Sequence, residues 1–270
     1  MQGISLILTD LDGTLFHNDK TISDYTKRVI AEAQKKGILF GISTARARVN
    51  AVKFLDGLSP DILITNGGGM VTYFENEKTD SSGKINLAAG KKIYSCEFSV
   101  QEVRTLIKTA FEVCGANTIL SVDNEIGLYS NSKDELGDKF WAYNDFSDFN
   151  EPGMKLCIQT LDKEKVTKVA SSVGLEQVDY LPFSDIPWYK LSKKDATKER
   201  AIEALCKHLN IQPSQVVAFG DDFNDIGMLK LCGKGIAMEN AIDEVRQIAD
   251  EVCGSNEADG VAKWIENHIL

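Results

Sequence analysis

Two short acidic segments are the first candidates for chemistry in this 270-residue chain. They are DLDGT at residues 10–14 and GDDFND at residues 220–225, and each directly follows an apolar run. Carboxylates this close repel one another and are costly to bury without a cation. Because Mg²⁺ prefers carboxylate and other oxygen ligands, the two segments predict a magnesium site. The alternative is a polar turn at each place, in which Gly13 supplies a permissive backbone angle and Asp222 or Asn224 caps the next helix.

Hydroxyl and ammonium groups elsewhere in the chain could bind an anion beside that metal. Ser43 and Thr44 follow another apolar run, where a hydroxyl and a helix N-terminus can donate to phosphate oxygens, although either residue could simply cap a helix. Lys198 opens an amphipathic segment, a position that is mildly unfavourable for a cation unless it faces an anion. Lys193 and Lys194 lie close by and could be solvated surface charges.

The elements that must position these residues alternate between strand and helix signals. Strands are expected at residues 4–9, 38–43, 61–65, 216–220 and 236–238, and helices at residues 23–36, 47–55, 198–209, 224–231, 241–249 and 258–268. Strands spaced by helices of this length predict βαβ units and a parallel sheet. Since ligands bind at the carboxyl ends of parallel strands, the acidic segments and the hydroxyls should meet there.

A polar, turn-rich stretch at residues 75–84 marks a change in the pattern. Beyond it, Ser99 and Glu102 form a capping-box pattern that opens a helix ending at Cys114. Further elements of this middle region are expected at residues 118–122, 127–130, 155–160, 163–173 and 178–183. The sequence therefore predicts an α/β core made of residues 1–82 and 188–270, interrupted by an inserted α/β domain at residues 83–187.

Composition limits the classes of partner. The net charge is −10 and the pI is about 4.9, which argues against nucleic acid or an anionic membrane as the main partner. The chain has no apolar run long enough to span a bilayer, and a secretory signal is not expected because no basic region opens it. None of the six cysteines forms a Cys-x-x-Cys pair, so reduced thiols in a cytoplasmic protein are expected.

Together these motifs resemble the haloacid dehalogenase superfamily of phosphohydrolases, in particular its Cof-like sugar-phosphatase branch. The four motifs of that family are matched by residues 10–14, by Thr44 with Arg46, by Lys198, and by residues 220–225. Features of the branch are matched at residues 66–68, 236–241, 255–256 and 259–261. Two positions depart from the family pattern, since Ala45 and Glu239 stand where glycine is common.

The resemblance implies a Rossmann-like parallel-sheet core and a cap formed by the inserted domain. It implies that Asp10 is the nucleophile that takes the phosphoryl group and that Asp12 is the general acid and base. The other implied roles are Mg²⁺ ligation by Asp10, the Asp12 carbonyl, Asp221 and Asp225; phosphoryl binding by Thr44, Lys198, Asn224 and Gly13; and a substrate pocket that includes Arg46, Asn66 and Gly67. The implied substrate is a small phosphorylated metabolite.

Other functions and other roles stay open at this point. A phosphomutase or phosphotransferase would pass the phosphoryl group from Asp10 to a sugar. A non-catalytic sensor would have no need of Asp12, and a response-regulator receiver domain has no room for a domain-sized insertion. Four polar residues of the inserted domain, Asp123, Asn124, Tyr129 and Asn131, could face the substrate, although surface turns are the favoured interpretation of each.

Overall fold

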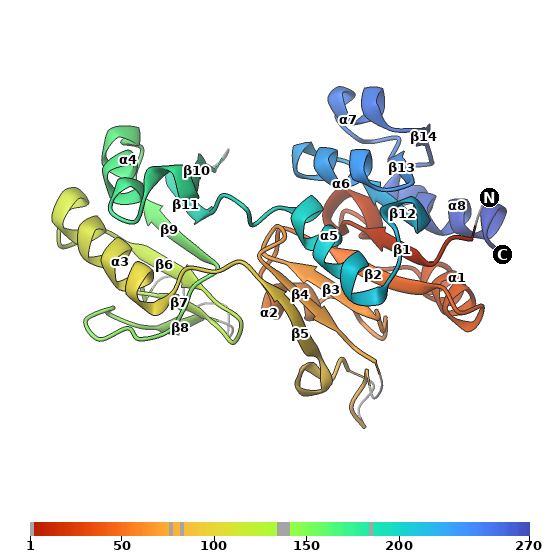
Figure 1. The fold of residues 1–270 in the computed structure, drawn as a ribbon, viewed down its shortest axis with the longest axis horizontal. Helices are drawn as coiled ribbons and strands as arrows, with labels where there is room; N and C mark the ends of the chain where they lie inside the picture. The colour runs from red at the N-terminus through yellow and green to blue at the C-terminus, as the bar shows by residue number, and fades with distance from the viewer. Residues whose placement is uncertain (1–2, 76–77, 82–83, 134–140, 184–185) are drawn as a thin grey trace. The chain divides into compact units, whose positions relative to one another are not determined.

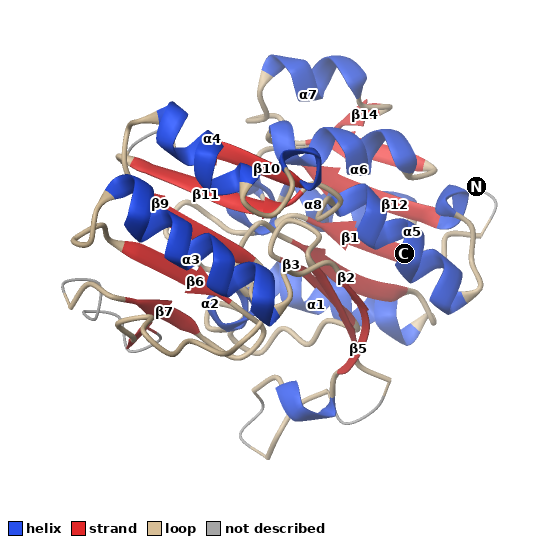
Figure 2. Cartoon of the chain, turned by 60° about the vertical axis from the view of Figure 1, so that its left-hand side comes forward, coloured by secondary structure: helices blue, strands red, loops and turns tan. Residues whose placement is uncertain are grey.

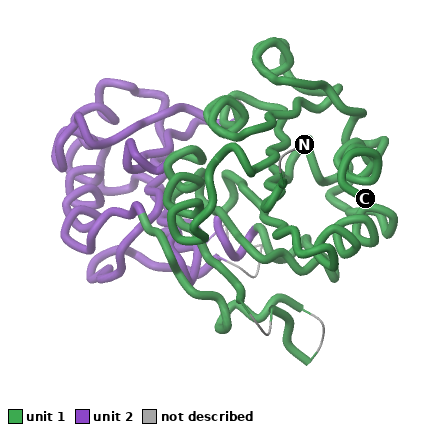
Figure 3. Tube along the Cα trace, turned by 45° about the vertical axis from the view of Figure 1, so that its right-hand side comes forward, with its two compact units in different colours: residues 1–46, 51–95, 197–270 green, residues 47–50, 96–196 purple. Residues whose placement is uncertain are grey.

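The computed structural model describes residues 3–75, 78–81, 84–133, 141–183 and 186–270 (Figure 1). The chain divides into two compact units, which Figure 3 colours separately. The first contains residues 1–46, 51–95 and 197–270, and the second contains residues 47–50 and 96–196. Over the described residues, no helix combines the length and the apolar character needed to cross a bilayer.

An eight-stranded sheet forms the centre of the first unit, in the order β14-β13-β12-β1-β2-β3-β4-β5. The pairs from β14 to β3 are parallel, and β3, β4 and β5 pair antiparallel at one edge. The bounds are β1 Leu6–Thr9, β2 Leu39–Ser43, β3 Ile62–Thr65, β4 Met70–Tyr73, β5 Lys91–Ser95, β12 Val216–Gly220, β13 Lys234–Ala237 and β14 Glu251–Val252. The predicted α/β fold with a parallel sheet is confirmed.

Helices cover both faces of this sheet. Figure 2 shows α1 and α8 on one face and α5 and α6 on the other. The bounds are α1 Asp24–Lys35, α2 Arg48–Val52, α5 Lys198–Leu209, α6 Ile226–Leu231, α7 Asp243–Ile248 and α8 Gly260–His268. Ser23 caps α1 by accepting the Thr26 N–H, as the sequence predicts. The helix expected from residue 224 begins instead at Ile226, because a 3₁₀ turn over Phe223–Asp225 comes first.

The second unit is a six-stranded sheet with two helices on one face. Its order is β10-β11-β9-β6-β7-β8. The bounds are β6 Leu120–Asp123, β7 Leu128–Ser130, β8 Trp141–Tyr143, β9 Lys155–Gln159, β10 Val178–Pro182, β11 Trp188–Lys193, α3 Val100–Cys114 and α4 Lys163–Ser171. Apolar residues of α3 and α4, such as Leu106 and Val169, pack with Leu120 and Ile158 in a core of their own. The predicted capping box of Ser99 and Glu102 is present.

The boundaries between the units differ from those expected at residues 82/83 and 187/188. Strand β5 pairs with β4 of the first sheet, so the first unit extends to residue 95. Strand β11 pairs with β9 and β10 of the second sheet, so the second unit extends to residue 196. Backbone pairing thus decides where each unit ends, and the described residues of the polar stretch, 75, 78–81 and 84, lie within the first unit.

Candidate active site

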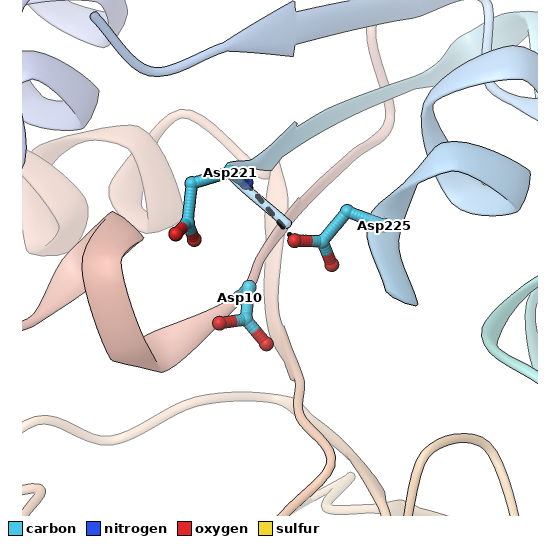
Figure 4. A group of neighbouring side chains, drawn as sticks. All are labelled: Asp10, Asp221 and Asp225. Carbon is cyan, nitrogen blue, oxygen red and sulfur yellow. Dashed lines mark hydrogen bonds between the residues drawn. The ribbon is translucent and has the colours of Figure 1, made fainter. Parts of the chain in front are cut away.

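Three aspartates gather at the carboxyl edge of the first sheet. Asp10 follows β1 and Asp221 follows β12, two strands that are neighbours in the sheet, while Asp225 ends the 3₁₀ turn just beyond. One carboxylate oxygen from each lies within 4.8 Å of the others, and Figure 4 shows the three side chains close together. An all-oxygen donor set of this kind fits a hard divalent cation such as Mg²⁺.

Lys198 is the cation that the protein itself supplies to this cluster. It is the first residue of α5, and its ammonium donates to Asp10 Oδ1, Asp225 Oδ1 and the Ser43 carbonyl, each at 2.6 Å. Its side chain is only 2% exposed, so three acceptors satisfy a fully buried ammonium. The helix-opening position that is unfavourable for an isolated cation is therefore explained by the two carboxylates it faces.

Burial and charge shift the titration of these groups. Burial is the largest influence on Asp10 and, with the nearby Asp225 and Asp221 carboxylates, raises its pKa to about 7 against the opposing effect of Lys198. Burial likewise raises the pKa of Asp221 to about 6. Burial alone would lower the pKa of Lys198, but Asp10 and Asp225 raise it above its usual value. Without a divalent cation the site is therefore short of positive charge.

Asp225 uses both carboxylate oxygens within the protein. Oδ1 accepts from Lys198, and Oδ2 accepts the backbone N–H groups of Asp221 and Asp222 at 3.0 and 3.2 Å. Its side chain is 2% exposed. Asp225 thus orients both the lysine and the strand end that carries Asp221, which leaves it less free than Asp10 or Asp221 to bind a metal directly.

The backbone at Asp12 and Gly13 forms a sharp turn beside Asp221. Asp12 has φ −76° and ψ 120°, and Gly13 has φ 77° and ψ −3°, which are the angles of a type II turn and favour glycine at the second position. A Cβ on Gly13 would also collide with the Asp221 carboxylate. Thr14 follows the turn and donates its hydroxyl to Asp221 Oδ1 at 2.6 Å. Gly13 is needed here both for its φ and for its lack of a side chain.

The Asp12 side chain is held by two cations. Arg46 donates from Nε to Oδ2 at 2.5 Å and from Nη2 to Oδ1 at 2.7 Å, and Lys20 donates to Oδ1 at 2.8 Å. Partial burial raises the pKa of Asp12, but these hydrogen bonds and charges outweigh it and hold that pKa below its usual value. The predicted proton donor is thus an ionised carboxylate in this structure. Lys20 was not among the residues predicted from the sequence.

Other predicted residues lie on loops at the same sheet edge. Thr44 is buried, and its hydroxyl accepts the Arg46 N–H at 3.2 Å. The N–H groups of Asn66 and Gly67 donate to the carbonyls of Arg46 and Thr44, at 2.8 and 2.9 Å. Both residues have positive φ, 55° and 69°, and together they connect the loop after β3 to the loop after β2. Asn224 is exposed in the 3₁₀ turn.

Residues near the C-terminus explain the branch-like motifs to which the sequence assigned no role. Asn240 Nδ2 donates to the Gly13 carbonyl at 2.8 Å, and the Asn256 N–H donates to Asn240 Oδ1 at 3.0 Å. Asn256 Nδ2 donates to the Phe16 carbonyl at 2.9 Å. Asp259 Oδ1 accepts from three side chains of the segment after Gly13, which are His17, Ser23 and Thr26. These contacts fix the loop that carries Asp12 and Gly13.

Asn240→Asp tests this contact with the Gly13 carbonyl. The aspartate keeps an acceptor for the Asn256 N–H, but it replaces the donor to Gly13 with a repelling oxygen. We expect kcat/KM to fall by about tenfold, equivalent to about 1.4 kcal/mol, with little change in the melting temperature. The control is the same replacement at the exposed Asn150. A loss of stability without a loss of kcat would show that Asn240 serves the fold alone.

In the second unit, polar residues predicted to lie in surface turns or to be solvated are found in other settings. Asp123 and Asn124 are buried rather than in surface turns. Lys155 pairs with Asp123 at 3.0 Å, and Asn124 Oδ1 accepts the N–H groups of residues 126 and 127. Lys193, expected to be solvated, pairs with Glu102 and lies 5.3 Å from the Phe98 ring centroid. Tyr129 lies in strand β7 rather than in a turn, and both Tyr129 and Asn131 are partly buried.

All six cysteines are free thiols. Burial raises the pKa of Cys157 and of Cys253 to about 12, so neither is a reactive thiolate at neutral pH. The expectation of unpaired cysteines is met in the structure.

Comparison with known proteins places the chain in a family of hydrolases, which agrees with the acidic site described above. The family model for haloacid dehalogenase-like hydrolases matches residues 7–265. The chain is 26% identical to the 5-amino-6-(5-phospho-D-ribitylamino)uracil phosphatase YitU of Bacillus subtilis, covering 98% of this chain and 97% of that protein. It is 25% identical to the phosphatase YwpJ of the same organism, covering 99% and 100%.

A solved structure shows the same fold. The sugar phosphatase BT4131, of subclass IIB in the same superfamily, superposes with a TM-score of 0.72 at 20% identity, covering 97% of this chain and 98% of that one. The fold, the site and the family match lead to one conclusion. The chain belongs to the haloacid dehalogenase-like hydrolases, as its motifs predict, and it is a phosphoric monoester hydrolase.

Proposed function

We propose that the chain is a Mg²⁺-dependent phosphatase that removes phosphate from a small metabolite through an aspartyl-phosphate on Asp10. The observation that carries this proposal is the arrangement of Asp10, Asp221, Asp225 and Lys198 at one sheet edge, with Lys198 2.6 Å from the Asp10 carboxylate. A nucleophilic carboxylate needs neighbouring positive charge to receive an anionic phosphoryl group.

Asp10 would act in two steps. In the first, a carboxylate oxygen of Asp10 attacks phosphorus, the bond from phosphorus to the leaving oxygen breaks, and Asp12 gives that oxygen a proton. In the second, Asp12 takes a proton from water, the water oxygen attacks phosphorus, and the Asp10 carboxylate leaves as phosphate is formed. Asp12 ends each cycle in its starting state. Before the first step it must leave Arg46 and Lys20, which hold it ionised, and take up a proton from the solvent.

Asp10, the Asp12 carbonyl and Asp221 would hold Mg²⁺, and Asp225 would support them through its bonds to Lys198 and to the Asp221 N–H. When bound, the ion supplies charge neutralisation for the nucleophile and the phosphoryl oxygens. Lys198, Thr44 and Asn224 would hold the phosphoryl oxygens, and Gly13 would let the backbone approach them. Most of the catalytic effect is then positioning and charge.

The second unit would serve as the cap that excludes water and reads the leaving group. The names of the relatives support a small phosphorylated substrate. YitU is named for a phosphoribitylaminouracil, and BT4131 is described as a sugar phosphatase. A screen of sugar phosphates, nucleotides and vitamin phosphates for phosphate release identifies the substrate class. A sugar acceptor that suppresses phosphate release would instead favour phosphotransfer.

Removal of divalent metal should abolish turnover. Without a cation, Asp10 and Asp221 repel each other and the incoming phosphate, so p-nitrophenyl phosphate hydrolysis after chelation should fall by at least about 10²-fold. Adding back Mg²⁺ should restore the rate, whereas adding Na⁺ at equal ionic strength should not. Full turnover by the metal-stripped protein would show that hydrolysis does not require a divalent cation.

A further inference from the structure

We infer that Arg46 and Lys20 form a binding site for a second oxyanion on the substrate, a carboxylate or an additional phosphate. This group would displace Asp12 from the two cations and so release the general acid. The inference rests on the function proposed above and narrows its substrate class to phosphomonoesters that carry another acidic group.

The contacts of Asp12 define the site. Three charged hydrogen bonds, at 2.5, 2.7 and 2.8 Å, join its carboxylate to the Arg46 guanidinium and the Lys20 ammonium. The side chains of Asp12, Arg46 and Lys20 are 38%, 23% and 41% exposed, so a ligand in solution can reach them. A guanidinium fork binds a carboxylate or a phosphate through the same pair of parallel bonds. An oxyanion of the substrate can therefore replace the Asp12 carboxylate and accept the same hydrogen bonds.

The chemistry proposed for Asp12 requires such an exchange. Both carboxylate oxygens accept bonds from cations here, so Asp12 has to turn away from Arg46 and Lys20 to face the leaving oxygen. When Asp12 turns to the leaving oxygen, Arg46 and Lys20 lose their anion. A substrate with no acidic group besides the reacting phosphate, here called neutral, leaves these two charges unpaired. A substrate with a second acidic group, here called acidic, pairs them again and makes release of Asp12 easier.

Arg46 also has contacts that do not involve Asp12. Its guanidinium carbon lies 4.9 Å from the ring centroid of Phe54 and 5.8 Å from that of Phe16, an arrangement typical of cation–π contact. Its backbone N–H donates to the Thr44 hydroxyl, and its carbonyl accepts the Asn66 N–H. The two rings therefore still hold the guanidinium when Asp12 leaves, which favours a preformed anion site.

Lys20 is held in an unusual backbone conformation. Its φ is 67°, which is uncommon for a residue with a long side chain. Its N–H donates to the His17 carbonyl at 2.9 Å and closes the turn. Strain of this kind collects at functional sites, and here it directs an ammonium toward the same carboxylate as Arg46.

Matched substrates test the inference. Each pair shares the phosphoryl group and differs by one acidic group: 3-phosphoglycerate and glycerol 3-phosphate, 6-phosphogluconate and glucose 6-phosphate, and fructose 1,6-bisphosphate and fructose 6-phosphate. For at least one pair, kcat/KM should favour the acidic member by about tenfold or more, as expected for a charged hydrogen-bonded pair. Part of the gain should appear in kcat, because release of Asp12 accompanies the chemical step.

Substitutions then assign the preference to the two cations. Arg46→Gln should bring the ratio of kcat/KM for the acidic substrate to kcat/KM for the neutral one to within about threefold of one. Lys20→Gln should lower this ratio by a smaller factor. Lys53→Gln is the matched control, since its ammonium lies 5.0 Å from the centroid of the same Phe54 ring, and the ratio should not change. If Arg46→Gln lowers kcat/KM for both substrates of a pair by the same factor, Arg46 only positions Asp12 and the inference is overturned.

A binding measurement separates failure of the inference from failure of the proposed function. The Asp10→Asn variant should bind the acidic member of a pair at least about threefold more tightly than the neutral one by calorimetry in Mg²⁺. Equal binding, or a preference of the active enzyme for the neutral members, overturns the inference and leaves the phosphatase assignment intact. Absence of phosphate release from every ester, including p-nitrophenyl phosphate, overturns both.

Discussion

Asp10→Asn should abolish turnover, with kcat on p-nitrophenyl phosphate lowered by at least about 10⁴-fold, while the protein remains folded. An amide nearly matches the carboxylate in shape, but it cannot form the acyl-phosphate. It also cannot keep the same charged bond with Lys198, which lies 2.6 Å from Asp10 Oδ1. The measurement is steady-state kinetics in Mg²⁺, with circular dichroism to verify the fold. Activity within tenfold of the parent would place the nucleophile elsewhere.

The same variant has an expected pH signature in the metal-free protein. Burial raises the pKa of Asp10 to about 7 from an ordinary value of 3.8, so between these limits the folded state holds a proton that the unfolded state has lost. This carboxyl therefore makes the wild-type protein less stable as pH rises through that window. Because asparagine does not titrate, Asp10→Asn should gain stability relative to wild type from pH 5 to pH 8. Thermal melts in chelator at both pH values measure the change, and a gain that shrinks as pH rises would contradict it.

Lys198→Ala should produce the second large loss, about 10²–10³ in kcat/KM, or roughly 3–4 kcal/mol. Its ammonium is buried among Asp10, Asp225 and the Ser43 carbonyl. There it would balance the carboxylates in the free enzyme and the phosphoryl oxygens in the transition state. The alanine variant also leaves buried Asp225 without its cation, so a fall in melting temperature should accompany the kinetic loss.

Two neighbouring lysines give the controls. Lys194 is exposed, so Lys194→Ala should change kcat/KM by no more than about threefold. Lys193 pairs with Glu102 inside the second unit, so Lys193→Ala should lower stability more than it lowers kcat. If either substitution costs more activity than Lys198→Ala, the assignment of the phosphate-binding lysine is wrong.

The sequence was most informative where function depends on strand ends. An apolar run followed by aspartates indicates a buried parallel strand with carboxylates at its carboxyl end. Because the carboxyl ends of parallel strands share one sheet edge, the proximity of Asp10 and Asp221 could be predicted. Lys198 could be predicted too, because an isolated cation at a helix start requires an anion. The edge strands β4 and β5 could not. They are short and antiparallel, and β5, with the sequence KKIYS, has no clear apolar alternation.

Contacts that depend on loop conformation were not predictable. Lys20 reaches Asp12 through a left-handed turn that its sequence does not encode clearly. The pair of Lys193 with Glu102 joins β11 to the start of α3, residues that come together only when the second sheet is assembled. The role of Asn240 is similar, since its bond to Gly13 spans most of the chain. Each of these required the tertiary structure.

The most direct test of the account is to trap the phosphoryl group on Asp10. The Asp12→Asn variant should be mixed with p-nitrophenyl phosphate and Mg²⁺, since this leaving group needs no proton donor while the second step still needs Asp12 as a base. After an acid quench, mass spectrometry should find one added phosphoryl group on the peptide that contains Asp10, and a stoichiometric burst of p-nitrophenolate should accompany it. Adding Asp10→Asn to this variant should remove both signals. A burst with the phosphoryl group on another residue, or turnover with no phosphorylated protein, would contradict the account.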